Sequence, residues 1–186
     1  LGEVYHMESA FGFPPLPQED FRYQRALGGG ALADAAGYPV AAARLLFGEE
    51  PEMVSALTEG DSEHGVDVRG ILQLRFPSGR TAHAAFGFTY SYRNTYALWG
   101  SRGRLEVARA FSIPPTLSPP ITLMTGEGVT AILAPAADQF RLMIEAFCDA
   151  IRSSTRTDDG YEADALAQAR VMDAARQSAR QDGRYV

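Results

Sequence analysis

The residues with the most chemical potential lie in one stretch, residues 28 to 48, which reads GGGALADAAGYPVAAARLLFG. Three glycines could open a phosphate-binding loop, because a glycine backbone can approach a phosphate closely. The same glycines could simply precede an ordinary helix. A third interpretation is a catalytic helix, because Asp34 and Tyr38 are four residues apart and share a helical face. A tyrosine hydroxyl can act as a general acid or base.

The phosphate loop is the weakest of these interpretations. Gly28, Gly30 and Ala33 fit a G-x-G-x-x-G/A pattern, and Glu50 has the spacing of a ribose-binding acid. That loop, however, needs a buried parallel strand leading directly into the glycines. The preceding residues, QEDFRYQRAL, are polar, and no second βα unit follows. We therefore expect no cofactor-binding residues in this chain.

Tyr38 stands at an expected break in the helix. Pro39 removes one helical N–H and disturbs the turn around Ala35, and the residue before a proline is pushed from ideal helical angles. A kink there could aim the tyrosine hydroxyl out of the packed face, although a packed tyrosine remains an alternative. Asp34 falls in the first turn, where a carboxylate either satisfies backbone amides or serves catalysis.

The flanking pattern predicts the elements that would hold these residues. Strands are expected over residues 3–13, 52–58, 66–76 and 81–92, in a hairpin over 96–107, and over 121–124 and 128–133. Helices are expected over 31–47, 136–152 and 162–181. This order lacks βαβ alternation and predicts an α+β fold, in which a mostly antiparallel sheet carries helices on one face.

The second face of such a sheet would be broad and exposed. Alternate residues from Ala82 to Tyr92 include Phe86, Phe88 and Tyr90, and the other row of that strand is small and polar. If the aromatic row faced outward, it would form a large apolar patch of the kind that marks subunit or domain interfaces. Trp99, at the tip of the hairpin, is expected to pack beneath it.

Composition bounds the function classes. The chain has 186 residues, enough for one sizeable core, and its net charge of −6 argues against nucleic acid and anionic membranes as partners. No apolar run is long enough to span a bilayer. The single cysteine, Cys148, excludes an internal disulfide and indicates a cytoplasmic setting. His6, His64 and His83 lack metal-ligand spacing, so no metal is expected.

Two further features are unusual. The chain begins at Leu1 within strand-like sequence, as though it starts inside a larger protein. It contains no lysine, since all seventeen basic residues are arginines. Chemistry that needs a lysine ammonium must therefore obtain it elsewhere.

Several segments together resemble one family. GGGALADAAGYPVAAARLLFGEEP, LRFPSGRTAHAAFGF, SYRNTYALWGSRGRLEV and YEADALAQARVMDAARQSAR look like the C-terminal domain of the Gfo/Idh/MocA oxidoreductases, across essentially the whole chain. The most specific match is the family's Asp-x-Gly-x-Tyr/His pattern after the glycines. Here it runs from Asp34 to Tyr38, with Ala36 replacing the usual middle glycine. The segment SYRNTYALWGS is most similar to sugar-modifying members, in particular nucleotide-sugar 3-ketoreductases.

The resemblance implies one α+β substrate-binding and oligomerisation domain over residues 1–186, of the glyceraldehyde-3-phosphate dehydrogenase-like C-terminal type. An N-terminal Rossmann domain, absent from this chain, would bind NAD or NADP and supply a catalytic lysine. This arrangement would explain both the start at Leu1 and the missing lysine. The chain alone is then expected to be inactive. The open sheet face would support a homodimer or tetramer.

The resemblance also assigns roles to residues of this chain. Tyr38 would donate or accept the proton at the substrate oxygen, and Asp34 would orient or support the site. A tyrosine with a pKa near 10 needs a nearby cation to work near neutral pH, and the other domain's lysine would provide it. The glycines Gly28, Gly29 and Gly30 would let the backbone approach the substrate or the nicotinamide. Arg22, Tyr23 and Arg25, in the polar loop just upstream, would contact the hydroxyls or phosphate of the substrate.

The resulting hypothesis is the C-terminal domain of an NAD(P)-dependent oxidoreductase that acts on a sugar or nucleotide-sugar carbonyl or hydroxyl. One alternative is a non-catalytic dimerising or sugar-binding module on the same fold. Another is a degenerate regulatory paralogue that binds sugar without turning it over. The expected partners are the Rossmann domain, the small-molecule substrate and further copies of the chain.

Overall fold

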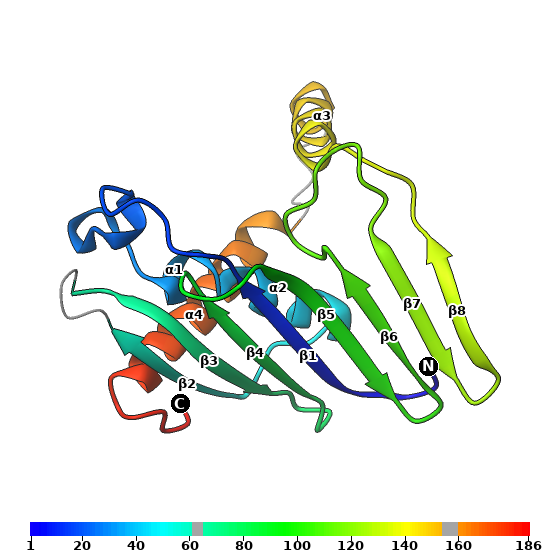
Figure 1. Ribbon diagram of the computed structural model, residues 1–186, viewed down its shortest axis with the longest axis horizontal. Coiled ribbons are helices and arrows are strands. Elements are labelled where there is room, and N and C mark those ends of the chain that lie inside the picture. Colours follow the sequence, from blue (N-terminus) through cyan, green and yellow to red (C-terminus); the bar gives the residue numbers. More distant parts are fainter. Residues whose placement is uncertain (61–64, 154–159) are drawn as a thin grey trace.

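The computed structural model describes residues 1–60, 65–153 and 160–186. These residues form one eight-stranded sheet in the spatial order β2-β3-β4-β1-β5-β6-β7-β8 (Figure 1). Its strands are β1 (Val4–Gly12), β2 (Met53–Gly60), β3 (Asp67–Arg75), β4 (Thr81–Gly87), β5 (Arg93–Gly100), β6 (Gly103–Ala108), β7 (Pro120–Thr125) and β8 (Gly128–Leu133).

The first strand of the chain lies in the middle of this sheet. β1 pairs in parallel with β4 on one side, where Met7 is opposite Ala82, and antiparallel with β5 on the other, where Met7 is opposite Leu98. Every other strand pair in the sheet is antiparallel. The predicted α+β class with a mostly antiparallel sheet is therefore confirmed.

Helices gather on one face of the sheet. The long helix α4 (Tyr161–Ala179) packs on β2, while α1 (Ala31–Asp34) packs on β3 and β4, and α2 (Gly37–Phe47) on β1. In Figure 1 these helices lie behind the strands. The core between the two layers contains fully buried apolar side chains, including Met7, Val40, Leu72, Phe76 and Phe86.

Two further groups of helical residues lie outside this layer. The short 3-10 helices η1 (Phe21–Tyr23) and η2 (Arg25–Leu27) precede α1. The helix α3 (Gln139–Arg152) stands clear of the rest of the protein at the top of Figure 1. Within the described part of the chain, no helix is both long and apolar enough to cross a membrane.

The helix expected over residues 31–47 is divided in two. α1 ends at Asp34, its C-cap is Ala35, and α2 begins at Gly37. Pro39 falls in the first turn of α2, where a missing N–H is tolerated because no earlier carbonyl needs it for the helix. The predicted disturbance around Ala35 is confirmed as a break between two helices.

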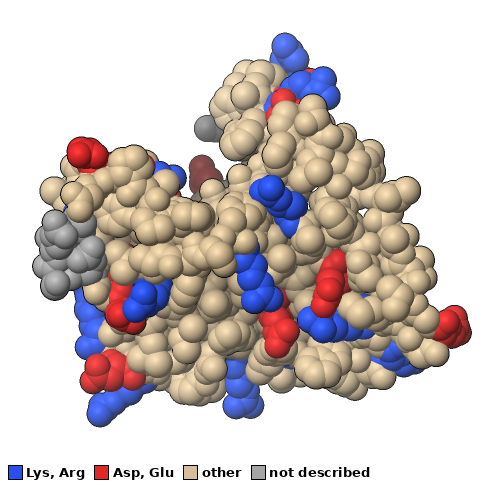
Figure 2. Space-filling view, viewed as in Figure 1, with Lys and Arg blue, Asp and Glu red and all other residues tan. Residues whose placement is uncertain are grey.

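The open face of the sheet does not carry the apolar patch that an outward-facing aromatic row would have formed. β4 ends at Gly87 rather than near residue 92, and Phe86 and Phe88 are fully buried on the helix side. The reason is strand alternation, since Phe86 pairs with the core residue Phe11. The open face instead carries the small and polar row that includes His83 and Ala85. Figure 2 shows arginines and acidic residues scattered over this face.

Trp99 also departs from expectation. Its side chain is 60% exposed rather than packed beneath the hairpin. Trp99 is paired with His6 of β1 and Arg104 of β6 in the sheet register, and this row of side chains lies on the open face. Alternation along β5 turns Trp99 away from the core because the preceding residue, Leu98, pairs with Met7 on the helix side.

Candidate active site

Tyr38 sits at the start of α2 on a floor of aromatic rings. Its side chain is 46% exposed, and its ring lies 4.9 Å from the Phe11 ring and 6.1 Å from the Phe111 ring, measured between centroids. Among the residues that the structure describes, none forms a hydrogen bond with the Tyr38 hydroxyl. The ring is thus fixed by packing while the hydroxyl is available to a ligand.

Asn94 holds the aromatic floor in place. This β5 side chain is 2% exposed, and its Oδ1 accepts a 2.8 Å hydrogen bond from the Phe111 backbone N–H. Its Nδ2 donates to the Ser112 carbonyl at 3.3 Å and to the Tyr92 hydroxyl at 3.1 Å. The loop after β6 is therefore fastened to the sheet with Phe111 against Tyr38. Sequence reasoning missed Asn94, although an asparagine within an alternating strand was a visible signal.

Asp34 engages an arginine of the upstream loop. Its Oδ2 accepts a 2.9 Å hydrogen bond from Arg22 Nε, and Arg22 Nη1 also lies 3.3 Å from Asp20 Oδ1. Burial lowers the pKa of Arg22, but the hydrogen bonds and charges of Asp34 and Asp20 outweigh it, so the pKa lies above its usual value. Asp34 and Arg22, predicted separately, thus form one ion-paired unit beside the glycines.

The three glycines close the loop onto its own backbone. Gly30 donates its N–H to the Arg22 carbonyl at 2.9 Å, and a Cβ at Gly29 would overlap that same carbonyl oxygen. Gly28 adopts the left-handed conformation, with φ of 79°, that ends η2. These contacts explain locally why glycine stands at each of the three positions. The predicted approach of the glycine backbone to the substrate or nicotinamide stays a prediction.

The carboxylate that satisfies the first amides of α1 comes from Asp67, not Asp34. Asp67 Oδ2 accepts a 2.6 Å hydrogen bond from the Leu32 N–H, and a Cβ at Gly30 would overlap its Oδ1. Burial raises the pKa of Asp67 above its usual value, while the N–H groups of Leu32 and Ala31 oppose that rise. No local spacing pointed to this partner, which is distant in sequence.

Tyr23 and Arg25 are placed very differently. Tyr23 is 7% exposed, and its hydroxyl accepts a 3.1 Å hydrogen bond from the Leu16 N–H. Its side chain therefore packs in the core, where a direct contact with substrate would require it to move. Arg25 is exposed and lines a cleft of 580 Å³ together with Arg176 and Arg180 of the α4 end. Their predicted contacts with substrate remain predictions.

A buried arginine fixes α2 to the helix layer. Arg44 is 6% exposed and donates to both carboxylate oxygens of Glu50 at 2.7 and 2.8 Å. It also donates to Asp164 Oδ1 at 2.8 Å and to Gln168 Oε1 at 2.9 Å, and Gln168 in turn donates to the Gly37 carbonyl at 3.0 Å. The hydrogen bonds with Glu50 raise the pKa of Arg44. This network positions the start of α2, and with it Tyr38.

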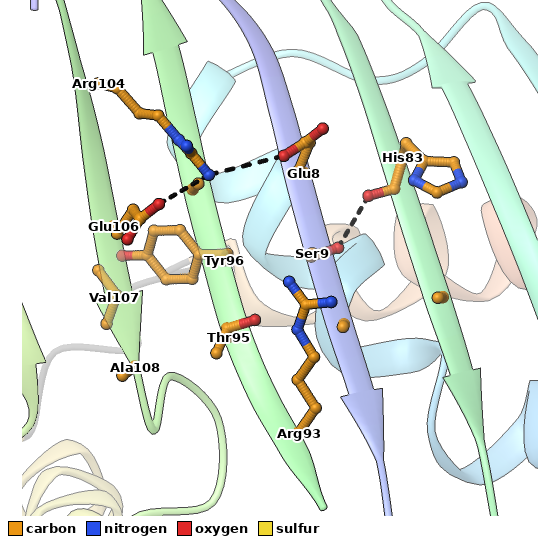
Figure 3. A pocket seen from close by; sticks show the side chains of 13 residues that line it. Glu8, Ser9, His83, Arg93, Thr95, Tyr96, Arg104, Glu106, Val107 and Ala108 are labelled. Atoms are coloured by element: carbon orange, nitrogen blue, oxygen red, sulfur yellow. Dashed lines mark hydrogen bonds and ion pairs between the residues drawn. The ribbon is translucent and has the colours of Figure 1, made fainter. Parts of the chain in front are cut away.

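A second hollow lies on the open face of the sheet, away from Tyr38 (Figure 3). It has a volume of 290 Å³, and Arg104 Nη2 crosses it, 2.7 Å from Glu106 Oε1 and 3.8 Å from Glu8 Oε2. His83 and Arg93 line its other sides. Within the described ranges, no group of three or more histidine, cysteine or acidic side chains could hold a metal ion. His64 lies outside those ranges.

Comparison with known proteins places this arrangement in a family. The model of the GFO/IDH/MocA C-terminal domain matches residues 1–106. The chain belongs to the Gfo/Idh/MocA family. This Gfo/Idh/MocA domain is 38% identical over 175 residues, 94% of its length, to a dTDP-3,4-didehydro-2,6-dideoxy-alpha-D-glucose 3-reductase of Saccharopolyspora spinosa. It is also 38% identical over 180 residues to the reductase of the same description from Actinomadura kijaniata.

Solved structures agree with this assignment of the Gfo/Idh/MocA domain. A 3-ketoreductase from Actinomadura kijaniata, in complex with NADP and TDP-benzene, superimposes with a TM-score of 0.91 at 36% identity over 96% of the chain. An aldose-aldose oxidoreductase from Caulobacter crescentus, complexed with glycerol, gives a TM-score of 0.86 at 30% identity over the whole chain.

The Gfo/Idh/MocA domain spans about half the length of these relatives. It covers 53% of the Saccharopolyspora reductase and 55% of the Actinomadura ketoreductase structure. The Actinomadura enzyme has also been solved as a variant with a tyrosine replaced by phenylalanine, and as variants with a lysine replaced by alanine or glutamate.

Proposed function

We propose that residues 1–186 form the substrate-binding domain of an NADP-dependent oxidoreductase that acts at a nucleotide-sugar carbonyl or the corresponding hydroxyl. The observation that carries this proposal is Tyr38, whose free hydroxyl stands on a fixed aromatic floor in a domain of this family. The dTDP-sugar reductases among the relatives support the nucleotide sugar as substrate, and the NADP in the Actinomadura ketoreductase supports the cofactor.

The chain's own contribution to such a reaction is proton transfer at the substrate oxygen. The nicotinamide, when bound by the other half of the protein, supplies hydride to the carbonyl carbon or removes it from the alcohol carbon. In the reducing direction, Tyr38 donates its proton to the carbonyl oxygen as negative charge develops there. In the oxidising direction, the Tyr38 phenolate accepts the proton of the substrate hydroxyl.

Tyr38 needs help to work near neutral pH. An ordinary tyrosine has a pKa near 10, and a nearby cation stabilises its phenolate. This chain has no lysine, so we propose that a lysine of the cofactor-binding half lies beside Tyr38. The tyrosine and lysine variants solved for the Actinomadura ketoreductase are consistent with a pair of this kind.

The ion-paired loop beside α1 is a candidate for substrate recognition. Asp34 holds Arg22 in place, and the side chain of Arg22 stays partly exposed, at 28%. We propose that this Arg22–Asp34 unit, with the backbone of Gly28 to Gly30, contacts the substrate. Arg25 in the neighbouring cleft is available for the phosphate groups of a nucleotide sugar.

We also propose that the open sheet face joins copies of the chain. Trp99 is 60% exposed there, and Arg104 lies between Glu8 and Glu106 in a hollow that a second subunit could fill. Size-exclusion chromatography with light scattering should give a dimer or tetramer. Replacing Trp99 by aspartate should then shift the mass to that of one chain, and a monomeric parent protein would remove this part of the proposal.

The decisive experiment replaces Tyr38 by phenylalanine in the full-length protein. We expect kcat for a dTDP-3-ketosugar to fall by about 10²–10⁴-fold, the range for losing a general acid, with little change in NADP affinity. Tyr161, at the start of α4 and 70% exposed, provides a matched control as Tyr161→Phe. Unchanged turnover in Tyr38→Phe would reject Tyr38, and sugar binding without any turnover in the parent protein would favour the non-catalytic module.

A further inference from the structure

Arg109, in the loop that follows β6, has a backbone conformation that glycine adopts readily and other residues do not. Its φ of 59° lies in the left-handed region, where a side chain with a Cβ is strained. A glycine would fit this position without strain, yet the chain has an arginine there. Strained residues of this kind collect at binding and catalytic sites. A function of the side chain would explain why an arginine stands at this position.

The guanidinium of Arg109 is held over an aromatic ring. Its Cζ lies 4.5 Å from the centroid of the Tyr92 ring, which is a cation–π contact. Tyr92 is fixed in turn, because its hydroxyl accepts a 3.1 Å hydrogen bond from the buried Asn94 side chain. Among the described residues, no oxygen accepts a hydrogen bond from this guanidinium and no carboxylate forms an ion pair with it. Arg109 therefore offers a positioned positive charge whose N–H donors are available to a ligand.

This positive charge lies beside the candidate active site. Asn94 binds the Tyr92 hydroxyl through Nδ2 and the Phe111 N–H through Oδ1, so one side chain fastens both aromatic residues. The Phe111 ring lies 6.1 Å from the Tyr38 ring. Arg109 precedes Phe111 by two residues, a span of at most about 7 Å of extended chain. The charge of Arg109 and the Tyr38 hydroxyl therefore border the same stretch of surface around Phe111.

The chemistry of this position suits a phosphate group. A guanidinium is a planar fork that donates two parallel hydrogen bonds to phosphate oxygens, and its stacking on a ring leaves the edge of the fork open. In a nucleotide sugar, the diphosphate is attached to C1, two ring positions from a carbonyl at C3. A substrate whose C3 oxygen meets Tyr38 thus carries its diphosphate about one sugar ring away. A cation two residues from Phe111 stands at a distance of that order.

We propose that Arg109 binds the diphosphate of the nucleotide sugar and thereby makes the domain prefer nucleotide sugars to free sugars. This inference rests on the proposed function. The relatives include reductases of dTDP-sugars and an aldose-aldose oxidoreductase, so the fold alone does not decide this preference. Arg25, the other cation considered for phosphate, lines the cleft beside β2 and β3, on the far side of β1 from Arg109. Arg109 is the arginine that shares the Phe111 surface with Tyr38.

The test measures the binding of thymidine diphosphate to the full-length protein with NADP, and the steady-state constants for a dTDP-3-ketosugar. Arg109→Gln should raise the Kd for thymidine diphosphate and the KM for the ketosugar by about 10–100-fold, the effect of losing a charge-assisted hydrogen bond, with little change in kcat. Arg109→Lys keeps the charge without the planar fork and should give an intermediate loss. Arg102 is a matched control, because it is also exposed and lies in the turn at the opposite end of β6. Arg102→Gln should leave both constants unchanged.

The outcomes separate this inference from the proposed function. If the parent protein turns over the ketosugar and Arg109→Gln binds thymidine diphosphate as tightly as the parent does, the diphosphate site is wrong and the function stands. A loss of binding in Arg25→Gln alone would place the diphosphate in the other cleft and overturn the inference in the same way. If Arg109→Gln loses thymidine diphosphate while the parent protein turns over no ketosugar, the phosphate site stands and the function is rejected.

Discussion

Replacing Gly30 by alanine should destabilise the domain much more than the same change at Gly28. Gly30 has φ of 119° and ψ of 143°, a region that a residue with a Cβ rarely adopts. A Cβ there would also overlap Asp67 Oδ1. The carboxylate would then have to move away and lose the hydrogen bond that the Leu32 N–H donates to it. At Gly28, φ is 79° and an added Cβ would meet no atom within 4 Å.

The structure sets the size of this difference. A strained residue costs roughly 1–3 kcal/mol, and losing a hydrogen bond to a charged group costs roughly 1.5–3 kcal/mol. Gly30→Ala should therefore lower the free energy of unfolding by about 3–5 kcal/mol. Gly28→Ala keeps all contacts and adds only the left-handed conformation, so about 1–2 kcal/mol is expected.

Urea unfolding of residues 1–186 measures both free energies. The midpoint of Gly30→Ala should fall well below that of Gly28→Ala, with unchanged denaturant slopes. In an Asp67→Ala background the overlap is gone, so Gly30→Ala should cost only the backbone strain, and the double-mutant cycle isolates the carboxylate. Equal losses for Gly30→Ala and Gly28→Ala would refute the packing argument and leave ligand contact as the reason for the glycine run.

Three other perturbations follow from described contacts. Burial lowers the pKa of His6 below 6.5, so the unfolded chain takes up a proton at a higher pH than the folded protein does. The free energy of unfolding should therefore fall as the pH drops from about 7 through the pKa of the folded state. Urea midpoints measured over a pH series should show a smaller loss in His6→Gln. Arg44→Met removes ion pairs whose acidic partners remain solvated, and thermal unfolding should report a loss of about 2–3 kcal/mol. Asn94→Leu removes the buried amide that pairs with the Phe111 N–H, and urea unfolding should show a loss of about 2–3 kcal/mol.

The positions of the elements follow from local sequence patterns. Alternation over residues 3–13 marks β1, and Pro39 marks the break that separates α1 from α2. These features depend on neighbours within one strand or one helical turn, where side-chain period and backbone chemistry decide the conformation. Which face of the sheet is buried was harder to predict from the sequence. Alternation separates two rows of side chains but does not show which row the helices cover.

The supports of the candidate site depend on contacts between distant residues. Asp67 reaches the start of α1 from β3, and Asn94 fastens Phe111 from across a hairpin. Arg44 joins α2 to a helix more than a hundred residues later in the chain. A single sequence shows the residue types but not these pairings. The tyrosine could be singled out from its motif, whereas the residues that hold it required the fold.

The central place of β1 has a consequence for how the domain forms. β2 to β4 make one antiparallel meander and β5 to β8 make another, and in the sheet only β1 joins the two. Each meander can assemble from contacts between nearby segments, but the sheet closes only when β1 pairs with strands about 75 and 90 residues further along the chain. Such non-local pairings carry a high loop-closure entropy and slow the folding of a domain. During synthesis, β1 therefore emerges before both meanders and yet pairs only after them.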